Sequence, residues 1–152
     1  TQQSYIKPSN AVADGGFGTS VSLQGDLLVV GANEDSNSTS IVNGSTASSD
    51  TSMEDSGAVY VFKLSDVVVD DPENFGSTMI VKRWSQIAYI KAVNNRAGVT
   101  SFGQRTALDN DTIIVGTPSE NSDQQGITNG SSASTDTSGG GSAGAAWIYH
   151  FY

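Results

Sequence analysis

Apolar residues occur along the chain in short blocks rather than at regular helical spacing. The blocks are rich in Val, Ile and aromatic residues, and Gly, Asn, Asp or Ser flanks them. This pattern is typical of β-strands, and no long run shows the apolar period of a helix. The sequence therefore predicts an all-β fold. In chain order, the predicted strands span residues 18–24, 27–32, 58–63, 84–91, 104–109, 112–117 and 145–151.

The chain also repeats itself, with an offset that grows from 84 to 87 residues. Because each copy contributes the same order of strands, we expect two copies of one supersecondary unit. Four antiparallel strands per copy is the composition of a β-propeller blade. The matching segments are 5–7 and 89–91 (both Tyr-Ile-Lys), 17–18 and 102–103 (both Phe-Gly), 27–31 and 112–116, and 57–62 and 144–149.

These residues resemble the FG-GAP repeats of integrin-α-like β-propellers and of bacterial extracellular repeat proteins. In the first copy the resemblance rests on residues 17–32, 56–62 and 84–92, and in the second on 102–103 and 111–116. The second copy departs from the family at Thr117-Pro118, where Ala is usual. The resemblance implies blade-like sheets in a secreted protein that is extracellular or at the cell surface.

Four of the repeated residues are expected to serve packing. Phe17 and Phe102 can fill the space between neighbouring sheets. Gly31 and Gly116 end the most buried strand of each copy, where a side chain would obstruct close approach of another backbone. We therefore assign these residues to the fold and not to chemistry.

The repeat divides the chain into three parts. Residues 1–16 correspond to a fourth strand and a linker, residues 17–92 to a complete first blade, and residues 93–152 to a second blade without a fourth strand. An unpaired strand and an unpaired sheet edge favour association. We therefore expect the N-terminal strand of one chain to complete the second blade of a neighbouring chain by strand addition. The expected assembly strand contains Gln3, Tyr5, Ile6 and Lys7, and the expected acceptor edge contains Trp147, Tyr149 and Phe151.

Such a contact joins two different surfaces, so it either closes into a ring or continues as a filament. Two chains would give four blades and three would give six, within the range of about four to eight blades in closed propellers. The expected function is a structural or adhesive protein that assembles with itself. The alternative is a fragment of a larger propeller that acts as a calcium-dependent ligand-binding or cell-adhesion module.

Composition excludes several classes of function. The chain has 16 acidic residues, 7 basic residues, a formal net charge of −9 and no Cys. Without a basic cluster there is no footprint for nucleic acid or for an anionic membrane surface, and without Cys there is no thiolate metal site or thiol nucleophile. No apolar run is long enough for insertion into a membrane. His150 is the one histidine, so a Ser-His-Asp triad is not expected and the chain is not predicted to be an enzyme.

Calcium is the candidate cofactor. Integrin-like repeats often carry an acidic loop after the second strand, and carboxylate and amide oxygens are the ligands that Ca²⁺ prefers. The regular Asp series and its Gly are missing here, so solvated acidic loops are the alternative. The candidate ligands are Asn33, Glu34, Asp35, Asn37, Glu120 and Asp123.

Two long polar loops, 36–56 and 121–143, leave each copy at the same place. Loops gathered on one face of a repeat protein commonly bind partners, here a protein or a glycan. The loops and one turn also fit the acceptor pattern for N-linked glycans. The candidate acceptors are Asn37, Asn43, Asn110 and Asn129.

Overall fold

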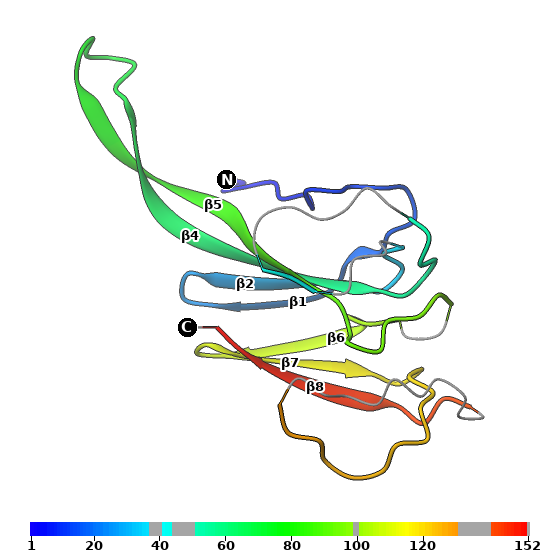
Figure 1. Cartoon of the computed structure of the whole chain (residues 1–152). Coiled ribbons are helices and arrows are strands. Elements are labelled where there is room, and N and C mark those ends of the chain that lie inside the picture. The colour runs from blue at the N-terminus through cyan, green and yellow to red at the C-terminus, as the bar shows by residue number, and fades with distance from the viewer. Residues whose placement is uncertain (37–40, 44–50, 99–100, 131–140, 152) are drawn as a thin grey trace.

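The computed structural model describes residues 1–36, 51–98, 101–130 and 141–151, and the backbone of residues 41–43. Every regular element in these ranges is a β-strand (Figure 1), which confirms the all-β prediction. The strands are β1 (Phe17–Gln24), β2 (Leu27–Ala32), β3 (Ile41–Asn43), β4 (Ala58–Asp70), β5 (Thr78–Ile90), β6 (Arg105–Asp109), β7 (Thr112–Thr117) and β8 (Ala145–His150).

The strands form two antiparallel sheets. The first sheet has the order β1-β2-β4-β5-β3 and the second has the order β6-β7-β8. The sheets meet along β1 and β6, where the Ser20 hydroxyl donates to the Gly103 carbonyl (2.8 Å) and the Ser22 hydroxyl to the Thr106 carbonyl (3.0 Å). Each repeat predicted from the sequence therefore forms its own sheet, and two sheets do not close a propeller.

Alternate residues of the first sheet face two different hydrophobic layers, as the two-residue period of a strand requires. One layer lies between the sheets, and the other covers the outer face of the first sheet. The inner layer contains Val29, Val59, Val61, Ala88, Ile90, Ala92, Phe102, Ile113 and Val115. The outer layer contains Val30, Ala32, Ala58, Tyr60, Phe62 and Tyr89, with Ile6, Phe17, Leu28 and Trp84 packed against it.

The sequence predicts no strand between 58–63 and 84–91, but β4 and β5 continue through most of this segment. The two strands pair without interruption from Phe62↔Gln86 to Asp70↔Thr78 and form a long hairpin that leaves the body of the molecule (Figure 1). Runs of β-branched residues favour this extension, and its acidic residues lie at the exposed surface and turn of the hairpin. The short β3, which the sequence did not predict, pairs with β5 from Ile41↔Ile90 to Asn43↔Ala88.

The two repeat-equivalent glycines differ in their surroundings. A Cβ at Gly31 would overlap the Gly103 carbonyl, so the second sheet approaches too closely for any side chain there. At Gly116 a Cβ would meet only Cβ of Arg105, at 3.7 Å. Close packing against another sheet therefore explains Gly31 but not Gly116 within one copy of the chain.

Residues 1–8 adopt no strand in the structure and lie along the outer face of the first sheet (Figure 1). Ile6 packs into the outer layer, while Tyr5 is 78% exposed. The Ser9 amide donates to the Gln86 side chain (3.1 Å) and holds this segment beside β5.

Candidate functional site

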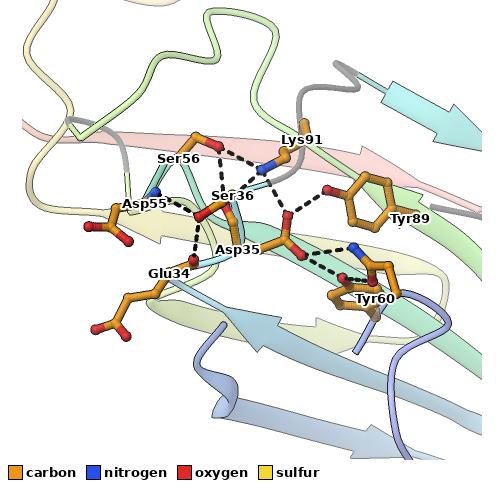
Figure 2. Close-up of polar contacts among 9 residues, drawn as sticks. Glu34, Asp35, Ser36, Asp55, Ser56, Tyr60, Tyr89 and Lys91 are labelled. Carbon is orange, nitrogen blue, oxygen red and sulfur yellow. Dashed lines mark hydrogen bonds and ion pairs between the residues drawn. The ribbon is translucent and has the colours of Figure 1, made fainter. Parts of the chain in front are cut away.

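A dense cluster of polar contacts surrounds Asp35, in the turn that follows β2 (Figure 2). The Asp35 carboxylate is buried, and both of its oxygens are engaged. Oδ1 accepts from the Tyr89 hydroxyl (2.8 Å) and lies 3.0 Å from Nζ of Lys91. Oδ2 accepts from the Tyr60 hydroxyl (2.6 Å) and from the Asn10 amide (3.2 Å). The site thus joins β4, β5 and the N-terminal segment around the end of β2.

Lys91 is fully buried and also donates to the main-chain carbonyl of Asp35 (3.0 Å) and to the Ser56 hydroxyl (2.7 Å). Burial lowers the pKa of Lys91 to about 8, although the charge of Asp35 acts in the opposite direction. Burial first, and the Asp35 charge second, raise the pKa of both Tyr60 and Tyr89 far above the usual value. A buried ion pair is tolerated where hydrogen bonds complete its geometry, as they do here.

Glu120, directly after β7, occupies the equivalent place in the second sheet. Its main-chain carbonyl accepts from the Gly144 amide (2.8 Å), as that of Asp35 accepts from the Gly57 amide (2.9 Å). Its carboxylate accepts from the Asn94 side chain (2.8 Å), which corresponds to Asn10 in the repeat. Glu120 is only 3% exposed, so both repeats bury an acidic side chain at this position.

The donors around the two carboxylates differ. The described residues that bond the Glu120 carboxylate are Asn94 and Ser122, and the Ser122 amide (3.0 Å) and hydroxyl (3.1 Å) both donate. None of these donors carries a charge. Trp147 stands at the place of Tyr60, and Asn94 Oδ1 is buried without a hydrogen bond in the described structure. Glu120 is therefore a buried carboxylate with a neutral set of donors.

The outward face of the second sheet is apolar and exposed. Ile148 of β8 is 66% exposed and Ile114 of β7 is also exposed, whereas their repeat equivalents Val61 and Val29 are fully buried between the sheets. β8 is the edge strand of its sheet. The second sheet therefore presents both an apolar face and a strand edge.

The predicted acceptor residues lie on β8 or directly after it, with their side chains directed toward the first sheet. Trp147 and Tyr149 make edge-to-face contacts with Phe102, with ring centroids 5.2 and 6.3 Å apart. Phe151 packs against the same inner layer. These side chains hold β8 in place, so an added strand would pair with the backbone of β8. Acceptance of a strand here stays a prediction.

The predicted calcium ligands do not converge. Asn33 bonds the Thr19 hydroxyl, Glu34 and Asp123 are exposed, and Asp35 and Glu120 follow strands of separate sheets. Asn37 lies outside the described residues. Within the described ranges no group of three or more His, Cys, Asp or Glu side chains is placed to hold a metal ion. Calcium binding stays a prediction, which calorimetry with Ca²⁺ and with EDTA would test.

Two of the predicted glycan acceptors can be placed. Asn110, in the turn between β6 and β7, and Asn129 are exposed. Asn37 and the side chain of Asn43 lie outside the described structure.

The imidazole of His150 is exposed and lies 3.1 Å from the Thr112 hydroxyl. Over the described part of the chain, none of the elements is a helix that could cross a bilayer.

The hydrogen-bond and ion-pair partners of Asp35 were not predicted from the sequence. A signal for them exists, because Tyr-Ile-Lys occurs twice, at 5–7 and 89–91, and each repeat has an acidic residue after its second strand. Only the structure shows that the lysine and the tyrosine of one such motif reach that acidic residue.

Comparison with known proteins gives one finding. No curated protein and no solved structure matches the chain. A family model for the FG-GAP repeat matches residues 1–62, from the N-terminal segment through β1 and β2 into β4. The match includes Asn10, Asp35 and Tyr60 of the buried site. It confirms the prediction of an FG-GAP repeat over residues 1–62.

Proposed function

We propose that the chain is a secreted structural or adhesive module that joins other copies of itself head to tail. In this proposal residues 1–7 of one copy add to β8 of the next as its fourth strand. FG-GAP repeats are typically non-enzymatic and usually occur in extracellular proteins, and the repeat in this chain suggests an adhesion-type module. Secretion, strand addition and self-assembly are proposed for this chain in addition to what is typical of FG-GAP repeats.

One observation carries the proposal. The outward face of the second sheet repeats the residues by which the first sheet contacts the second, but no sheet formed by the described residues covers it. Val29 and Val61 are buried in the contact between the sheets, while Ile114 and Ile148 at the equivalent positions are exposed. Covering such residues removes apolar surface from water, at about 25 cal/mol per Å². The first sheet of a second copy has the matching outer layer.

Gly116 supports the same docking. Its backbone is outside the left-handed region, and a Cβ would fit beside Arg105, so nothing within one copy requires glycine there. At Gly31 the requirement comes from Gly103 in the neighbouring sheet. The residue that corresponds to Gly103 in the first repeat is Gly18, which a second copy would bring against Gly116. A Cβ at Gly18 would meet no atom within 4 Å in one copy.

Residues 1–7 already lie where they could pair with β8 of a second copy. Ile6 packs on the outer layer of the first sheet, as its repeat equivalent Ile90 packs in the inner layer. The segment therefore runs where the fourth strand of a preceding sheet would run. Docking a second copy through β7 and β8 would bring the edge of β8 beside this segment, where backbone hydrogen bonds can form.

Light scattering after size-exclusion chromatography, over a range of protein concentrations, tests the proposal. We expect species larger than the 15.7 kDa chain, which electron microscopy would resolve into rings or filaments. Ile148→Lys places a charge in the docking face and should abolish assembly. Ile80→Lys is the matched control, because Ile80 is equally exposed but lies on the β4–β5 hairpin. A wild-type chain that stays monomeric at all concentrations overturns the proposal.

A further inference from the structure

We infer that Glu120 binds the ammonium group of Lys7 from a second copy, with the Tyr5 hydroxyl beside it. The inference rests on the proposed head-to-tail assembly and names the contact that makes this assembly specific. The partner is a second copy of the chain, recognised through a lysine and a phenol at a buried carboxylate.

The Asp35 site is the template for this contact. There the tyrosine and the lysine of the 89–91 motif both reach one carboxylate oxygen, at 2.8 and 3.0 Å. Tyr5 and Lys7 are the same residues in the other copy of the motif. In a sheet completed by residues 1–7, Tyr5 and Lys7 take the places of Tyr89 and Lys91.

The buried carboxylate of Glu120 favours the binding of a cation. A buried carboxylate is strongly disfavoured unless an opposite charge and hydrogen bonds compensate for the water it has lost. The main-chain and Asn contacts of Asp35 recur at Glu120, but the cation does not recur among the described residues. The unpaired Oδ1 of Asn94 adjoins this carboxylate and can accept a hydrogen bond from the incoming strand.

The N-terminal segment presents the required groups. Successive side chains of an extended segment point to opposite sides. Ile6 packs against its own sheet, whereas Tyr5 and Lys7 are exposed. The same alternation operates at the end of β5, where Ile90 packs in one layer and Tyr89 in the other. Tyr5 and Lys7 are therefore available to the next copy while Ile6 stays in place.

Charge complementarity identifies the occupant. The chain has only 7 basic residues, and its net charge of −9 disfavours indiscriminate self-association. An ion pair at the centre of the contact restores attraction at one place and fixes the register of the added strand. A strand shifted by one residue would present Ile6 to Glu120 instead of Lys7 and would leave the carboxylate uncompensated.

A double-mutant cycle tests the inference, with Lys7→Gln, Glu120→Gln and the double variant compared by sedimentation velocity. Each single change should weaken association at least about 30-fold, and the double variant should be no weaker than either single variant. Lys7→Arg keeps the charge and should retain association within about tenfold. Lys82→Gln and Glu73→Gln are matched controls on the exposed hairpin and its turn, and they should leave association unchanged.

The outcomes separate the two proposals. If the wild type assembles and Lys7→Gln assembles equally well, the inference is wrong while head-to-tail assembly stands. Independent, multiplicative effects of the two changes would also overturn it. A monomeric wild type overturns the assembly itself. Because Lys7 is exposed, Lys7→Gln leaves the folded monomer intact, and unchanged near-ultraviolet circular dichroism verifies this for both single variants.

Discussion

Asp35 and Glu120 occupy the same place in two copies of one sheet, but among the described residues only Asp35 has a cation beside it. Tyr89 at the Asp35 site comes from the end of β5, which is the fourth strand of the first repeat, and Lys91 directly follows this strand. The second sheet keeps the acidic residue, the linker asparagine and the glycine amide, but the described residues give it three strands and no counterpart of β5. The comparison shows that the fourth strand completes the polar site of a sheet as well as its edge.

The largest expected effect comes from removing the cation in the complete site. Lys91→Met keeps the apolar stem but leaves the Asp35 carboxylate buried without a positive charge. Breaking one side of a buried ion pair costs about 3–5 kcal/mol. We expect a loss of that size in the free energy of unfolding, measured by urea denaturation of the monomer.

Glu120→Gln is the contrasting change in the second sheet. The amide removes a buried charge and retains an oxygen that can accept from Asn94 and from Ser122. We expect the monomer to be at least as stable as the wild type, because the change removes a buried charge that no described cation compensates. Equal losses for Lys91→Met and Glu120→Gln would contradict the claimed difference between the two sites.

Substitution of Gly31 and of Gly116 by Ala should change the stability of the monomer to very different extents. Gly31→Ala forces a Cβ into the Gly103 carbonyl, which is backbone and cannot rotate away. We expect a destabilisation of about 3 kcal/mol, at the upper end for overpacking. Gly116→Ala adds a Cβ at an ordinary contact distance and should leave the monomer as stable as the wild type or slightly more stable. Thermal unfolding of the two variants side by side measures this contrast.

The strands of both sheets could be predicted from the sequence because their alternation is regular and their turns are marked. The hairpin of β4 and β5 was missed because Asp66, Asp70 and Asp71 resemble loop residues, while exposed strands beyond a core tolerate such charges. The pairing of β3 with β5 was missed as well, since three residues in a polar segment carry no detectable period.

The candidate site was predictable only in part. Asp35 and Glu120 were identified from the sequence as candidate calcium ligands, because acidic residues after a strand suggest oxygen ligation, and calcium binding there stays a prediction. The partners of Asp35 come from residues 25 to 56 positions away in the chain, through Asn10, Tyr60, Tyr89 and Lys91. Contacts of that sequence separation depend on how the strands pair, and local pattern does not encode them.

The third prediction concerns alkaline pH. Tyr60 and Tyr89 have raised pKa values in the folded chain, so they keep their protons above about pH 10 while the unfolded chain loses its phenolic protons. The contribution of these two phenols to the free energy of unfolding is complete below pH 10. Above pH 10 it falls by about 1.4 kcal/mol per pH unit for each phenol.

Lys91 acts in the opposite direction. Its pKa is lowered to about 8, so the unfolded chain binds more protons between about pH 8 and 10.5, and stability rises with pH in that window. We therefore expect a maximum of the free energy of unfolding near pH 10, followed by a steep fall. Urea denaturation in a pH series measures it, and a flat profile between pH 8 and 11 would contradict the burial of these groups.

The smallest expected effect concerns Tyr149, whose repeat equivalent in the first sheet is Phe62. Burial raises the pKa of Tyr149, and its hydroxyl has no hydrogen-bond partner among the described residues. Tyr149→Phe should therefore stabilise the monomer by about 1 kcal/mol, since it removes an unsatisfied polar group. Tyr60→Phe should destabilise by at least that amount, because Asp35 loses a donor. Stability at dilute concentration measures both changes. If Tyr149→Phe stabilises the monomer but weakens assembly, the partner of that hydroxyl belongs to the second copy.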